Sequence, residues 1–481
     1  MTIKQAILLD AFQKALDEGT AAFFVGAGMS RGAGFVDWRD LIRDIATDLD
    51  LDVDRETDLI ALAQYHVNQR GGRAAINQKL IDEFIKDAKP AENHALLATL
   101  PVHTIWTTNY DTVLEDAFRA AHKHVDVKRI SQNLTLTLPK RDAIIYKMHG
   151  DASLPDEAVL TKSDYEMFPS QRELFSVQLR GDLVSKTFLF LGYSFSDPNI
   201  DYILARIRVL LGRDKREHFA IMRAIPKPKG GSAKKRTQYE YDARKQELRI
   251  QDLQNYGIQT HLVQEYVEIT TILRELNRRA DRKNVFVSGS AADFNPFGKE
   301  RIENLARTLG TMIIQKDYNL VSGIGLGIGG AITIGAMEAL YESPASHMDE
   351  RTTLRPFPQV APSSGTLKRT WTRYRREMIS RAGFAIFLCG NKRKGGKLVE
   401  ADGVHEEFEI VAERGVYPVP VGATGHAALS IWNRVMANPK AYFHAYTPKV
   451  VEPLGVLNKP GVTDKQILDS VFAILKTIAP K

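Results

Sequence analysis

In the first half of the chain, four short motifs each follow directly on a short apolar run. In chain order the motifs are Gly26-Ala27-Gly28-Met29-Ser30, Thr107-Thr108-Asn109-Tyr110-Asp111, Lys147-Met148-His149-Gly150 and Gly192-Tyr193-Ser194. The apolar runs are residues 21–25, 103–107, 143–147 and 187–191. Strands that alternate with helical patterns are typical of a parallel α/β sheet. Because open α/β sheets bind ligands at the carboxyl ends of their strands, we expect the four motifs to line one ligand site.

The chain of 481 residues is too long for one ordinary hydrophobic core, so we expect more than one domain. Apolar runs, a glycine loop and helical patterns begin again at residue 284. The new runs are residues 284–287, 319–321, 384–388 and 417–421. We therefore predict an α/β protein of two Rossmann-like domains, residues 1–283 and 284–481. Residues 225–236 and 343–370, which are rich in proline, glycine or serine, are predicted to be exposed loops.

A single cysteine, Cys389, excludes an internal disulfide and also a zinc ribbon built from four thiolates. We expect no bound metal. Residues 1–18 have the charge spacing of an amphipathic helix, which differs from that of a signal peptide. Residues 318–337 carry no charge but contain six glycines, which favours a strand, loop and helix over a membrane span. We therefore expect a cytoplasmic protein without a membrane contact.

The net charge of +7 is modest for a chain of this length and suits anionic small ligands. The basic stretch at residues 227–236 contains no aromatic side chain on which a base could stack. For this reason a nucleic-acid partner is not expected.

The Gly26-Ala27-Gly28 turn lets a pyrophosphate approach the backbone closely, because glycine has no Cβ. Ser30 adds a hydroxyl donor. A tight turn between a strand and a helix explains the same glycines equally well, so this motif by itself leaves both interpretations open.

Asn109 and Asp111 follow the second strand, where an amide can orient ribose hydroxyls or a water. Both residue types also form ordinary turns. Among the twelve histidines, His149 is the best candidate for a general base, because it follows a strand and imidazole titrates near neutrality. A lone histidine is more often structural, so the case for His149 depends on its neighbours.

The order of the four motifs resembles the catalytic domain of the sirtuins over roughly residues 1–280. The resemblance implies that the glycine loop holds NAD, that the asparagine orders ribose and water, and that the histidine is the base on a ribose hydroxyl. By motif, the implied catalytic residues are His149 and Asn109, and the implied NAD-binding residues are Gly26, Ala27, Gly28, Ser30, Asp111 and Ser194. The stretch Phe35-Val36-Asp37-Trp38-Arg39 resembles another sirtuin segment, but Val36 replaces its proline.

Protein-deacylating sirtuins carry a zinc ribbon that helps to form the groove for the acyl peptide, and this chain lacks its cysteines. Without an acyl-lysine, water is the obvious nucleophile at the anomeric carbon. We therefore expect hydrolysis of NAD+ to nicotinamide and ADP-ribose through an oxocarbenium-like transition state. The alternatives are a deacylase and a nucleotide-binding module without turnover.

Small residues follow two strands of the second half, in Ser288-Gly289-Ser290 and Gly323 to Gly330. Such loops suit a nucleotide phosphate, although close packing of helix on sheet explains part of a glycine run. Arg375 lies in a basic helical pattern and Glu407 in an acidic one. These two are candidates to bind phosphate and ribose, and the alternative is a solvated helix face.

Residues 284–425 resemble the SLOG superfamily, which is related to phosphoribohydrolases. Only Gly403 and Glu407 keep the spacing of the family's catalytic signature, which favours a sensing role over chemistry at Glu407 on a nucleoside monophosphate. The implied ligand-binding residues are Gly289, Ser290, Gly325, Gly327, Arg375, Lys392 and Glu407.

A sirtuin-like domain followed by a SLOG domain resembles the NAD-consuming effectors of the Thoeris antiphage system. The resemblance implies that a cyclic ADP-ribose isomer, supplied by a TIR-domain partner protein, binds the second domain and activates NAD+ hydrolysis. It also implies a homo-oligomer, a tetramer or larger. Arg375 and Glu407 are then the pair that binds the activator.

Overall fold

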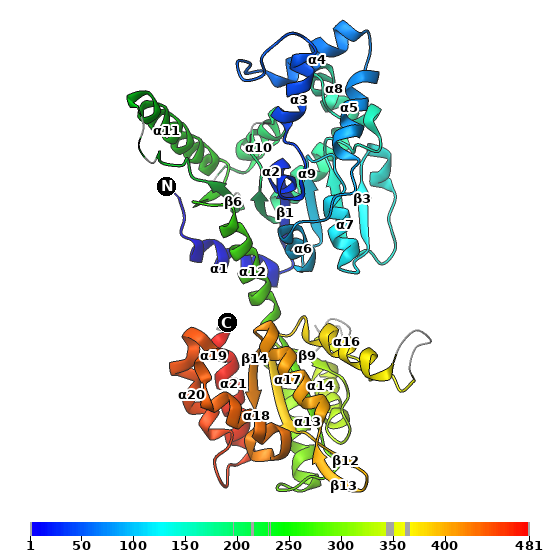
Figure 1. Ribbon diagram of the computed structural model, residues 1–481, viewed down its shortest axis with the longest axis vertical. Coiled ribbons are helices and arrows are strands. Elements are labelled where there is room, and N and C mark those ends of the chain that lie inside the picture. Colours follow the sequence, from blue (N-terminus) through cyan, green and yellow to red (C-terminus); the bar gives the residue numbers. More distant parts are fainter. Residues whose placement is uncertain are drawn as a thin grey trace. The chain divides into compact units, whose positions relative to one another are not determined.

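The computed structural model describes residues 2–195, 197–212, 216–228, 230, 232–342, 351–360 and 366–479. The chain divides into two compact units, Met1–Ala280 and Asp281–Lys481, and each is an α/β structure with its own sheet (Figure 1). Among the described residues, no helix combines the length and the apolar character needed to cross a membrane.

The first unit is built on a seven-stranded sheet with the order β3-β4-β2-β1-β5-β6-β7, and every neighbouring pair of strands is parallel. Its strands are β1 (Ala21–Val25), β2 (Thr104–Thr107), β3 (Val125–Lys128), β4 (Ala143–Lys147), β5 (Thr187–Leu191), β6 (His218–Arg223) and β7 (Ile258–Val263). The four strands expected before the motifs are therefore confirmed, and β7 includes a further strand expected near residues 260–263, whereas β3 and β6 were not expected from the sequence.

The two faces of this sheet are both covered by helices, as a parallel sheet requires. Successive side chains of a strand point to opposite faces, so Ala22 and Phe24 of β1 enter one apolar core while Phe23 and Val25 enter the other. The helices packed on the Phe23 side are α1 (Gln5–Asp17), α6 (Glu92–Thr99), α7 (Val113–Ala120) and α12 (Val267–Asp281). Those on the Phe24 side are α8 (Lys162–Gln171), α9 (Glu173–Ser185), α10 (Pro198–Leu211) and α11 (Ala233–Asn255).

A separate helical layer packs next to the sheet around a third apolar core that includes Phe35 and Phe84. It consists of α3 (Trp38–Thr47), α4 (Leu59–Arg70) and α5 (Ala74–Phe84), which lie together in Figure 1. The remaining short elements of the unit are α2 (Ala27–Ser30) and the 3₁₀ helices η1 (Arg31–Ala33), η2 (Ser131–Thr135) and η3 (Pro155–Glu157). In the sequence, the helices of this layer lie between the first and second motifs.

The second unit has a five-stranded parallel sheet with the order β10-β9-β8-β11-β14. Its strands are β8 (Asn284–Ser290), β9 (Asn319–Ser322), β10 (Thr352–Leu354), β11 (Phe384–Cys389) and β14 (Tyr417–Pro420), and β12 (Asn391–Lys394) and β13 (Lys397–Glu400) form an antiparallel hairpin. Pro418 and Pro420 are tolerated because β14 lies at an edge of the sheet, where a strand can lack amide donors.

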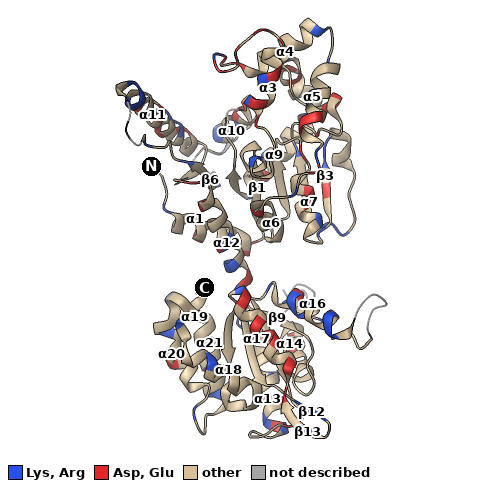
Figure 2. Ribbon diagram, viewed as in Figure 1, with Lys and Arg blue, Asp and Glu red and all other residues tan. Residues whose placement is uncertain are grey.

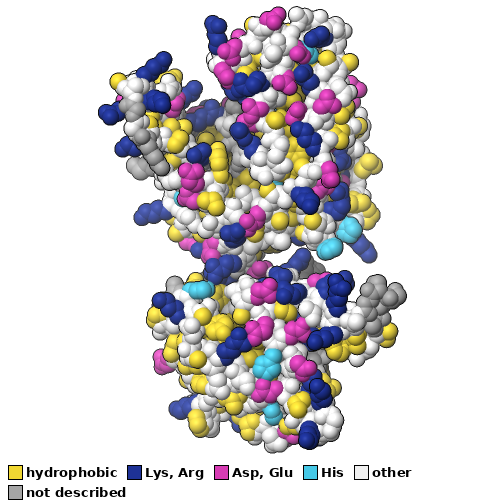
Figure 3. Space-filling model, in the orientation of Figure 1, with side chains coloured by type: hydrophobic (Ala, Val, Ile, Leu, Met, Phe, Trp, Pro, Cys, Tyr) yellow, Lys and Arg dark blue, Asp and Glu magenta, His cyan; other side chains and the backbone are white. Residues whose placement is uncertain are grey.

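Helices surround the single apolar core of this unit. They are α13 (Lys299–Gln315), α14 (Gly329–Tyr341), α16 (Leu367–Ile379), α17 (Asp402–Arg414), α18 (His426–Ala437), α19 (Pro439–Phe443), α20 (Thr447–Val456) and α21 (Asp464–Ile478), with the 3₁₀ helices η4 (Gly422–Thr424) and η5 (His444–Tyr446). On the face seen in Figure 3, basic and acidic side chains are interspersed over each unit, which argues against a nucleic-acid surface on that face.

The two expected loops are shorter than the sequence predicted. Helix α11 begins at Ala233, so the loop assigned to 225–236 ends before it, and residues 229 and 231 lie outside the described part. Within 343–370, β10 extends the sheet beside β9, and α16 begins at Leu367. Residues 343–350 and 361–365 of that stretch lie outside the described part. Pairing with a distant strand overrides the local loop composition here.

Cys389 ends β11 in the core of the second unit and is fully buried. Burial raises the pKa of its thiol to about 12, although Thr424 has the opposite effect. Because the thiolate is the reactive form, we expect the native protein to resist a maleimide reagent at pH 8. Mass spectrometry checks this: one label per chain in denaturant and none in buffer is the expected result, and rapid labelling of the native chain contradicts the described burial.

Candidate functional site

The carboxyl ends of four strands meet at one edge of the seven-stranded sheet (Figure 1). Val25 of β1 lies beside Thr107 of β2 and Leu191 of β5, and Thr107 lies beside Lys147 of β4. Each of the four motifs begins at one of these positions or directly after it. Because β2 and β5 flank β1 on opposite sides, the loops surround the point where the chain changes direction across the sheet, the usual place for a ligand in such folds.

The glycines of the first motif lie against the loop that follows β5. A Cβ at Gly26 or Gly28 would lie 2.5 or 2.9 Å from the carbonyl oxygen of Gly192. The amide of Gly26 donates to Leu191 and that of Gly28 donates to Gly192, both at 2.9 Å. Close packing therefore accounts for these glycines, and a pyrophosphate contact would have to use the neighbouring groups of the loop.

The side chain of Asn109 connects the second motif to the first. Its Nδ2 donates to the carbonyl of Gly26 at 3.2 Å and to the hydroxyl of Ser30 at 2.8 Å. Only 6% of Asn109 is exposed. The structure thus brings Gly26, Ser30 and Asn109 together as the sequence analysis expected of a shared site.

Two buried acceptor atoms of this motif have no hydrogen-bond partner among the described residues, Oδ1 of Asn109 and Oδ2 of Asp111. The other carboxylate oxygen of Asp111 accepts from the amide of Val113 at 3.1 Å. A buried acceptor without a donor costs free energy, so such atoms are usually completed by a ligand or a water. Ribose hydroxyls and the nicotinamide carboxamide are donors of the required kind, and the residues present therefore fit NAD+.

His149 is buried, with 5% of its side chain exposed. Its Nε2 lies 2.9 Å from Oδ2 of Asp197, a close contact between the ring and the carboxylate that lacks the geometry of a hydrogen bond. The rings of Tyr165 and Phe168, both from α8, stand edge-on to the imidazole with centroids 5.6 and 6.2 Å away. Asp197 lies just beyond the fourth motif and is not among the residues predicted from the sequence.

A buried ionic cluster lies beneath the second and third motifs. Lys147 has no exposed side-chain surface, and its Nζ lies 2.6 Å from Oδ2 of Asp151 and 3.2 Å from Oε1 of Glu115. Arg129 contacts the same carboxylates at 3.2 and 3.9 Å. Nζ of Lys147 also donates to the carbonyl of Asp111 at 2.5 Å. One lysine therefore ties together the loops that carry Asn109 and His149.

Three further residues singled out in the sequence, Ser194, Asp37 and Arg39, lie in different parts of this unit. Ser194 is exposed in the loop after β5. Asp37 caps α3 by accepting from the amide of Asp40 at 3.0 Å, and it pairs with Arg31 at 2.6 Å. Arg39 donates to the carbonyl of Val53 at 2.7 Å. The last two residues thus have structural roles within the helical layer.

In the second unit, the loops after β8, β9 and β11 also meet at one edge, because Val287 lies beside Ser322 and Ser290 lies beside Cys389. The glycines there are packed tightly. A Cβ at Gly289 would lie 2.5 Å from the carbonyl oxygen of Leu388, one at Gly325 would lie 2.1 Å from that of Gly289, and one at Gly327 would lie 2.5 Å from that of Ala291. Backbone packing, which the sequence analysis held to explain only part of the glycine run, accounts for all three.

Arg375 and Glu407 are brought together, since Nε of Arg375 donates to Oε1 of Glu407 at 3.2 Å. A second nitrogen of Arg375 donates to Glu406 at 2.8 Å, and the guanidinium lies 4.9 Å from the ring centre of Phe357. Ser288 donates to the other oxygen of Glu407 at 2.5 Å. Burial raises the pKa of Glu407, despite the opposing effects of Ser288 and Arg375. The ribbon in Figure 2 shows basic residues along α16 and acidic residues along α17.

Lys392, on the β12–β13 hairpin, pairs with Asp402 at the start of α17. Its neighbour Asn391 is fully buried and accepts from the amides of Ala292 and Asp293, both at 2.9 Å. The hydroxyl of Ser290 donates to the carbonyl of Asn391 at 3.1 Å. The hairpin is therefore fixed to the loop after β8, and this brings Ser290 and Lys392 to the same edge as Glu407.

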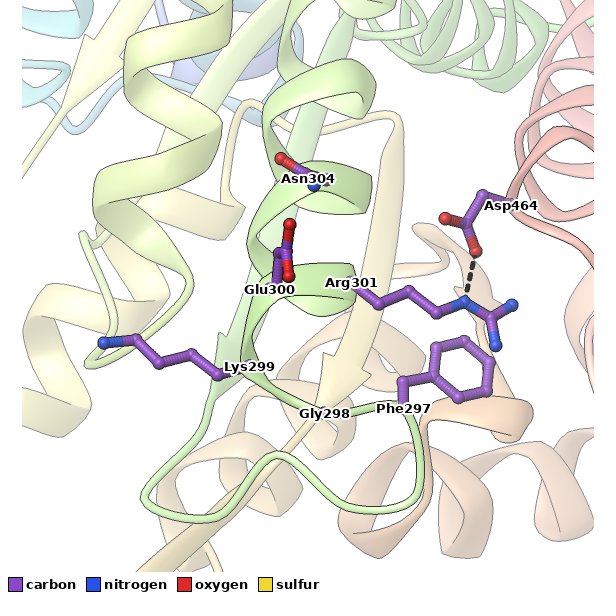
Figure 4. A pocket seen from close by; sticks show the side chains of 7 residues that line it. All are labelled: Phe297, Gly298, Lys299, Glu300, Arg301, Asn304 and Asp464. Carbon is purple, nitrogen blue, oxygen red and sulfur yellow. Dashed lines mark hydrogen bonds and ion pairs between the residues drawn. The ribbon is translucent and has the colours of Figure 1, made fainter.

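A hollow of about 430 Å³ lies elsewhere on this unit, at the start of α13 (Figure 4). Arg301 crosses it, with Nε 2.7 Å from Oδ1 of Asp464 and its guanidinium 3.7 Å from the ring centre of Phe297. Arg301, the cation that crosses the hollow, is already paired with Asp464, and this pair links α13 to α21. The hollow includes none of the predicted ligand residues.

No cluster of three or more histidine, cysteine, aspartate or glutamate side chains with the geometry of a metal site occurs in the described ranges.

Comparison with known proteins gives the following relatives. Residues 268–478 match the family model described as the Sir2- and TIR-associating SLOG family, and residues 103–253 match a SIR2-like domain. The chain is 42% identical over 474 residues to the NAD(+) hydrolase ThsA of Bacillus cereus (strain MSX-D12), covering 98% of both chains. It is 40% identical over 481 residues to the NAD(+) hydrolase ThsA of Acinetobacter baumannii (strain 532279), covering 99% of both. A solved structure of SIR2 with an inhibitor, 2'-O-acetyl-ADP-ribose and a deacetylated p53 peptide aligns with 56% of the chain and 96% of its own length, at 12% identity and a TM-score of 0.26, too low to inform the site.

Proposed function

This chain belongs to the ThsA family of NAD(+) hydrolases, and we propose that it cleaves the bond between nicotinamide and ribose of NAD+ with water, at the edge of its seven-stranded sheet. The observation that carries this proposal is the group of buried polar atoms on adjacent loops. Asn109 and Asp111 each offer an acceptor that no described residue partners, and His149 follows the neighbouring strand.

Each residue has a role in this reaction. Asn109, held by Gly26 and Ser30, orders the ribose and the attacking water, and Asp111 accepts from the nicotinamide carboxamide. As the glycosidic bond breaks, its electron pair leaves with the nicotinamide nitrogen and neutralises that ring. Water adds to the anomeric carbon, and its proton passes through a ribose hydroxyl to His149. The products are nicotinamide, ADP-ribose and one proton.

Water is the acceptor in this proposal because the chain has one cysteine and cannot form the ribbon that helps protein deacylases hold an acyl peptide. The test is to incubate the protein with NAD+ and quantify both products by chromatography, with and without an acetyl-lysine peptide. Equal yields of nicotinamide and ADP-ribose that do not depend on the peptide are expected. Nicotinamide release only with peptide would instead support a deacylase.

The second unit is proposed to be a sensor that controls this reaction. A cyclic ADP-ribose isomer, made by a TIR-domain partner protein, binds at the edge where Gly289, Ser290, Gly325 and Gly327 meet Arg375, Lys392 and Glu407. Binding then activates NAD+ hydrolysis in a homo-oligomer of four or more chains, and the loss of NAD+ aborts a phage infection. This proposal is supported by the SLOG match and by the position of Arg375 and Glu407 at the sheet edge. Action in the cytoplasm stays a prediction.

Replacing Arg375 with alanine tests the sensor. Arg375 is the buried cation of the site, and a charge-assisted contact contributes about 1.5–3 kcal/mol, so we expect the activator concentration for half-maximal activity to rise by roughly 10- to 100-fold. The measurement is nicotinamide release over a range of cyclic ADP-ribose concentrations.

The neighbouring Arg376 provides the matched control, since it pairs with exposed Glu413 on the surface. An Arg376→Ala chain should respond to the activator as the wild type does. A normal response of the Arg375→Ala chain would exclude Arg375 from the sensor site.

A further inference from the structure

Asp197 is the carboxylate closest to the proposed base. Its Oδ2 lies 2.9 Å from Nε2 of His149, and 9% of its side chain is exposed. The hydroxyl of Tyr165 donates to the same oxygen at 3.4 Å. The His149–Asp197 contact is therefore enclosed by protein, where a charge interaction is stronger than in water.

The backbone holds Asp197 in place independently of His149. Its Oδ1 caps helix α10, accepting from the amides of Asn199 at 2.9 Å and Ile200 at 3.2 Å. Pro198 occupies the first helical position, where its fixed backbone angle suits the start of a helix. One oxygen thus anchors the carboxylate to the fold, and the other is left to face His149.

The groups around the pair keep Asp197 ionised. Burial acts to raise the pKa of Asp197, but His149 and the two capping amides outweigh burial and lower it. From α8, Tyr165 faces the pair, and burial holds the pKa of its phenol well above the usual range. Two further titratable groups lie near Asp197. Tyr193 is in the loop after β5, and burial holds the pKa of its phenol well above the usual range. Asp201 is in α10, and burial raises the pKa of its carboxyl. Among the described residues, Asp197 is the carboxylate that contacts the imidazole within 4 Å.

We propose that Asp197 is a positioning residue that orients the His149 ring and holds its proton on Nε2, so that Nδ1 is the atom that takes the proton from the substrate. In a neutral histidine only one ring nitrogen carries a proton, and the partners of the two nitrogens decide which one it is. A carboxylate can only accept, so it favours N–H on the nitrogen that faces it. This proposal rests on the role of His149 as the base in NAD+ hydrolysis.

The test is Asp197→Asn. Asparagine caps helices as well as aspartate does, so α10 and the melting temperature should be preserved. The asparagine can present its amide N–H to Nε2, which moves the histidine proton to Nδ1 and removes the base. We expect kcat for nicotinamide release to fall by at least about tenfold, with KM for NAD+ within about twofold of wild type, because in this proposal Asp197 acts through His149 and not on the substrate.

A second readout is the tautomer of His149, measured from the ¹⁵N shifts of labelled histidine and assigned with a His149→Ala chain. Nε2–H in the wild type and its loss in Asp197→Asn are expected. The matched control is Asp201→Asn, one turn further along α10, which removes the same charge and should leave kcat and the tautomer unchanged.

The outcomes separate this proposal from the proposed function. If Asp197→Asn keeps the wild-type kcat and tautomer while His149→Ala is inactive, Asp197 does not position the base, although NAD+ hydrolysis at this site stands. If His149→Ala retains full activity, the proposed site itself is wrong, and the role of Asp197 falls with it.

Discussion

A His149→Ala chain should release nicotinamide from NAD+ roughly 10²- to 10⁴-fold more slowly than the wild type, the usual contribution of a general base. The reason is that the amide of Asn109 cannot take the proton that water loses, and Asp111 is engaged with the nicotinamide carboxamide in this proposal. The measurement is initial rates of nicotinamide release by chromatography, at saturating NAD+ and with activator present. Because His149 lies in a loop at the sheet edge and belongs to none of the apolar cores, we expect the variant to remain folded by circular dichroism.

His103 is the control for this experiment. It lies at the opposite end of β2 from Asn109, is exposed, and contacts the carbonyl of Asp142 at 2.7 Å. A His103→Ala chain should keep the wild-type rate. If His149→Ala and His103→Ala are equally active, the base lies elsewhere.

The largest effect on stability is expected for Lys147→Met. Removing Lys147 leaves Glu115 and Asp151 buried with Arg129 as their remaining cation, and breaking a buried ion pair costs roughly 3–5 kcal/mol. Burial alone would lower the pKa of Lys147, but Glu115 and Asp151 outweigh burial and raise it, so the lysine is charged at neutral pH. The measurement is the free energy of unfolding from urea denaturation.

Lys128 provides a comparison, because it is also a buried lysine of the same sheet. It lies 2.8 Å from Asp126, which in addition keeps Arg141 at 2.9 Å. Lys128→Met therefore leaves one carboxylate with its own cation, and the loss of stability should be smaller. Equal losses of unfolding free energy for the two variants would mean that the cluster around Lys147 contributes no more to stability than the Lys128–Asp126 pair.

Much of the fold could be predicted from the chain because the seven- and five-stranded sheets consist of parallel strands, most of which are buried on both faces. Such strands are short apolar runs, and the helices between them have clear periodicity. The strand that begins at Ala21 and the three others before the motifs have almost the expected bounds. The helical layer around Phe35 and the strand β10 were not found, since their stability comes from packing and pairing between distant segments.

The site could be predicted only where its residues are part of the motifs. Asn109 and His149 were recognised because they follow strands whose carboxyl ends meet. Asp197 was missed, since as the residue before a proline it has the local pattern of a helix cap, and only the fold places its second oxygen beside His149. Lys147 was counted as part of a strand, although a lysine in a buried run is itself an indication of a buried carboxylate partner.

For the glycines, the sequence predicts a ligand contact where the structure shows packing within the chain. Glycine loops at Gly26 and Gly289 were predicted to make room for phosphates, but in the structure each lies against a neighbouring backbone carbonyl. A sequence cannot distinguish a glycine that admits a ligand from one that admits another part of the chain, because both need the same missing Cβ.

The central claim is that NAD+ binds and reacts at the edge of the first sheet. It is tested most directly by a crystal structure of the inactive His149→Ala chain with NAD+. We expect the nicotinamide ribose beside Asn109, the carboxamide on Asp111 and the pyrophosphate near Ala27. NAD+ found only in the second unit, beside Arg375 and Glu407, would contradict the claim.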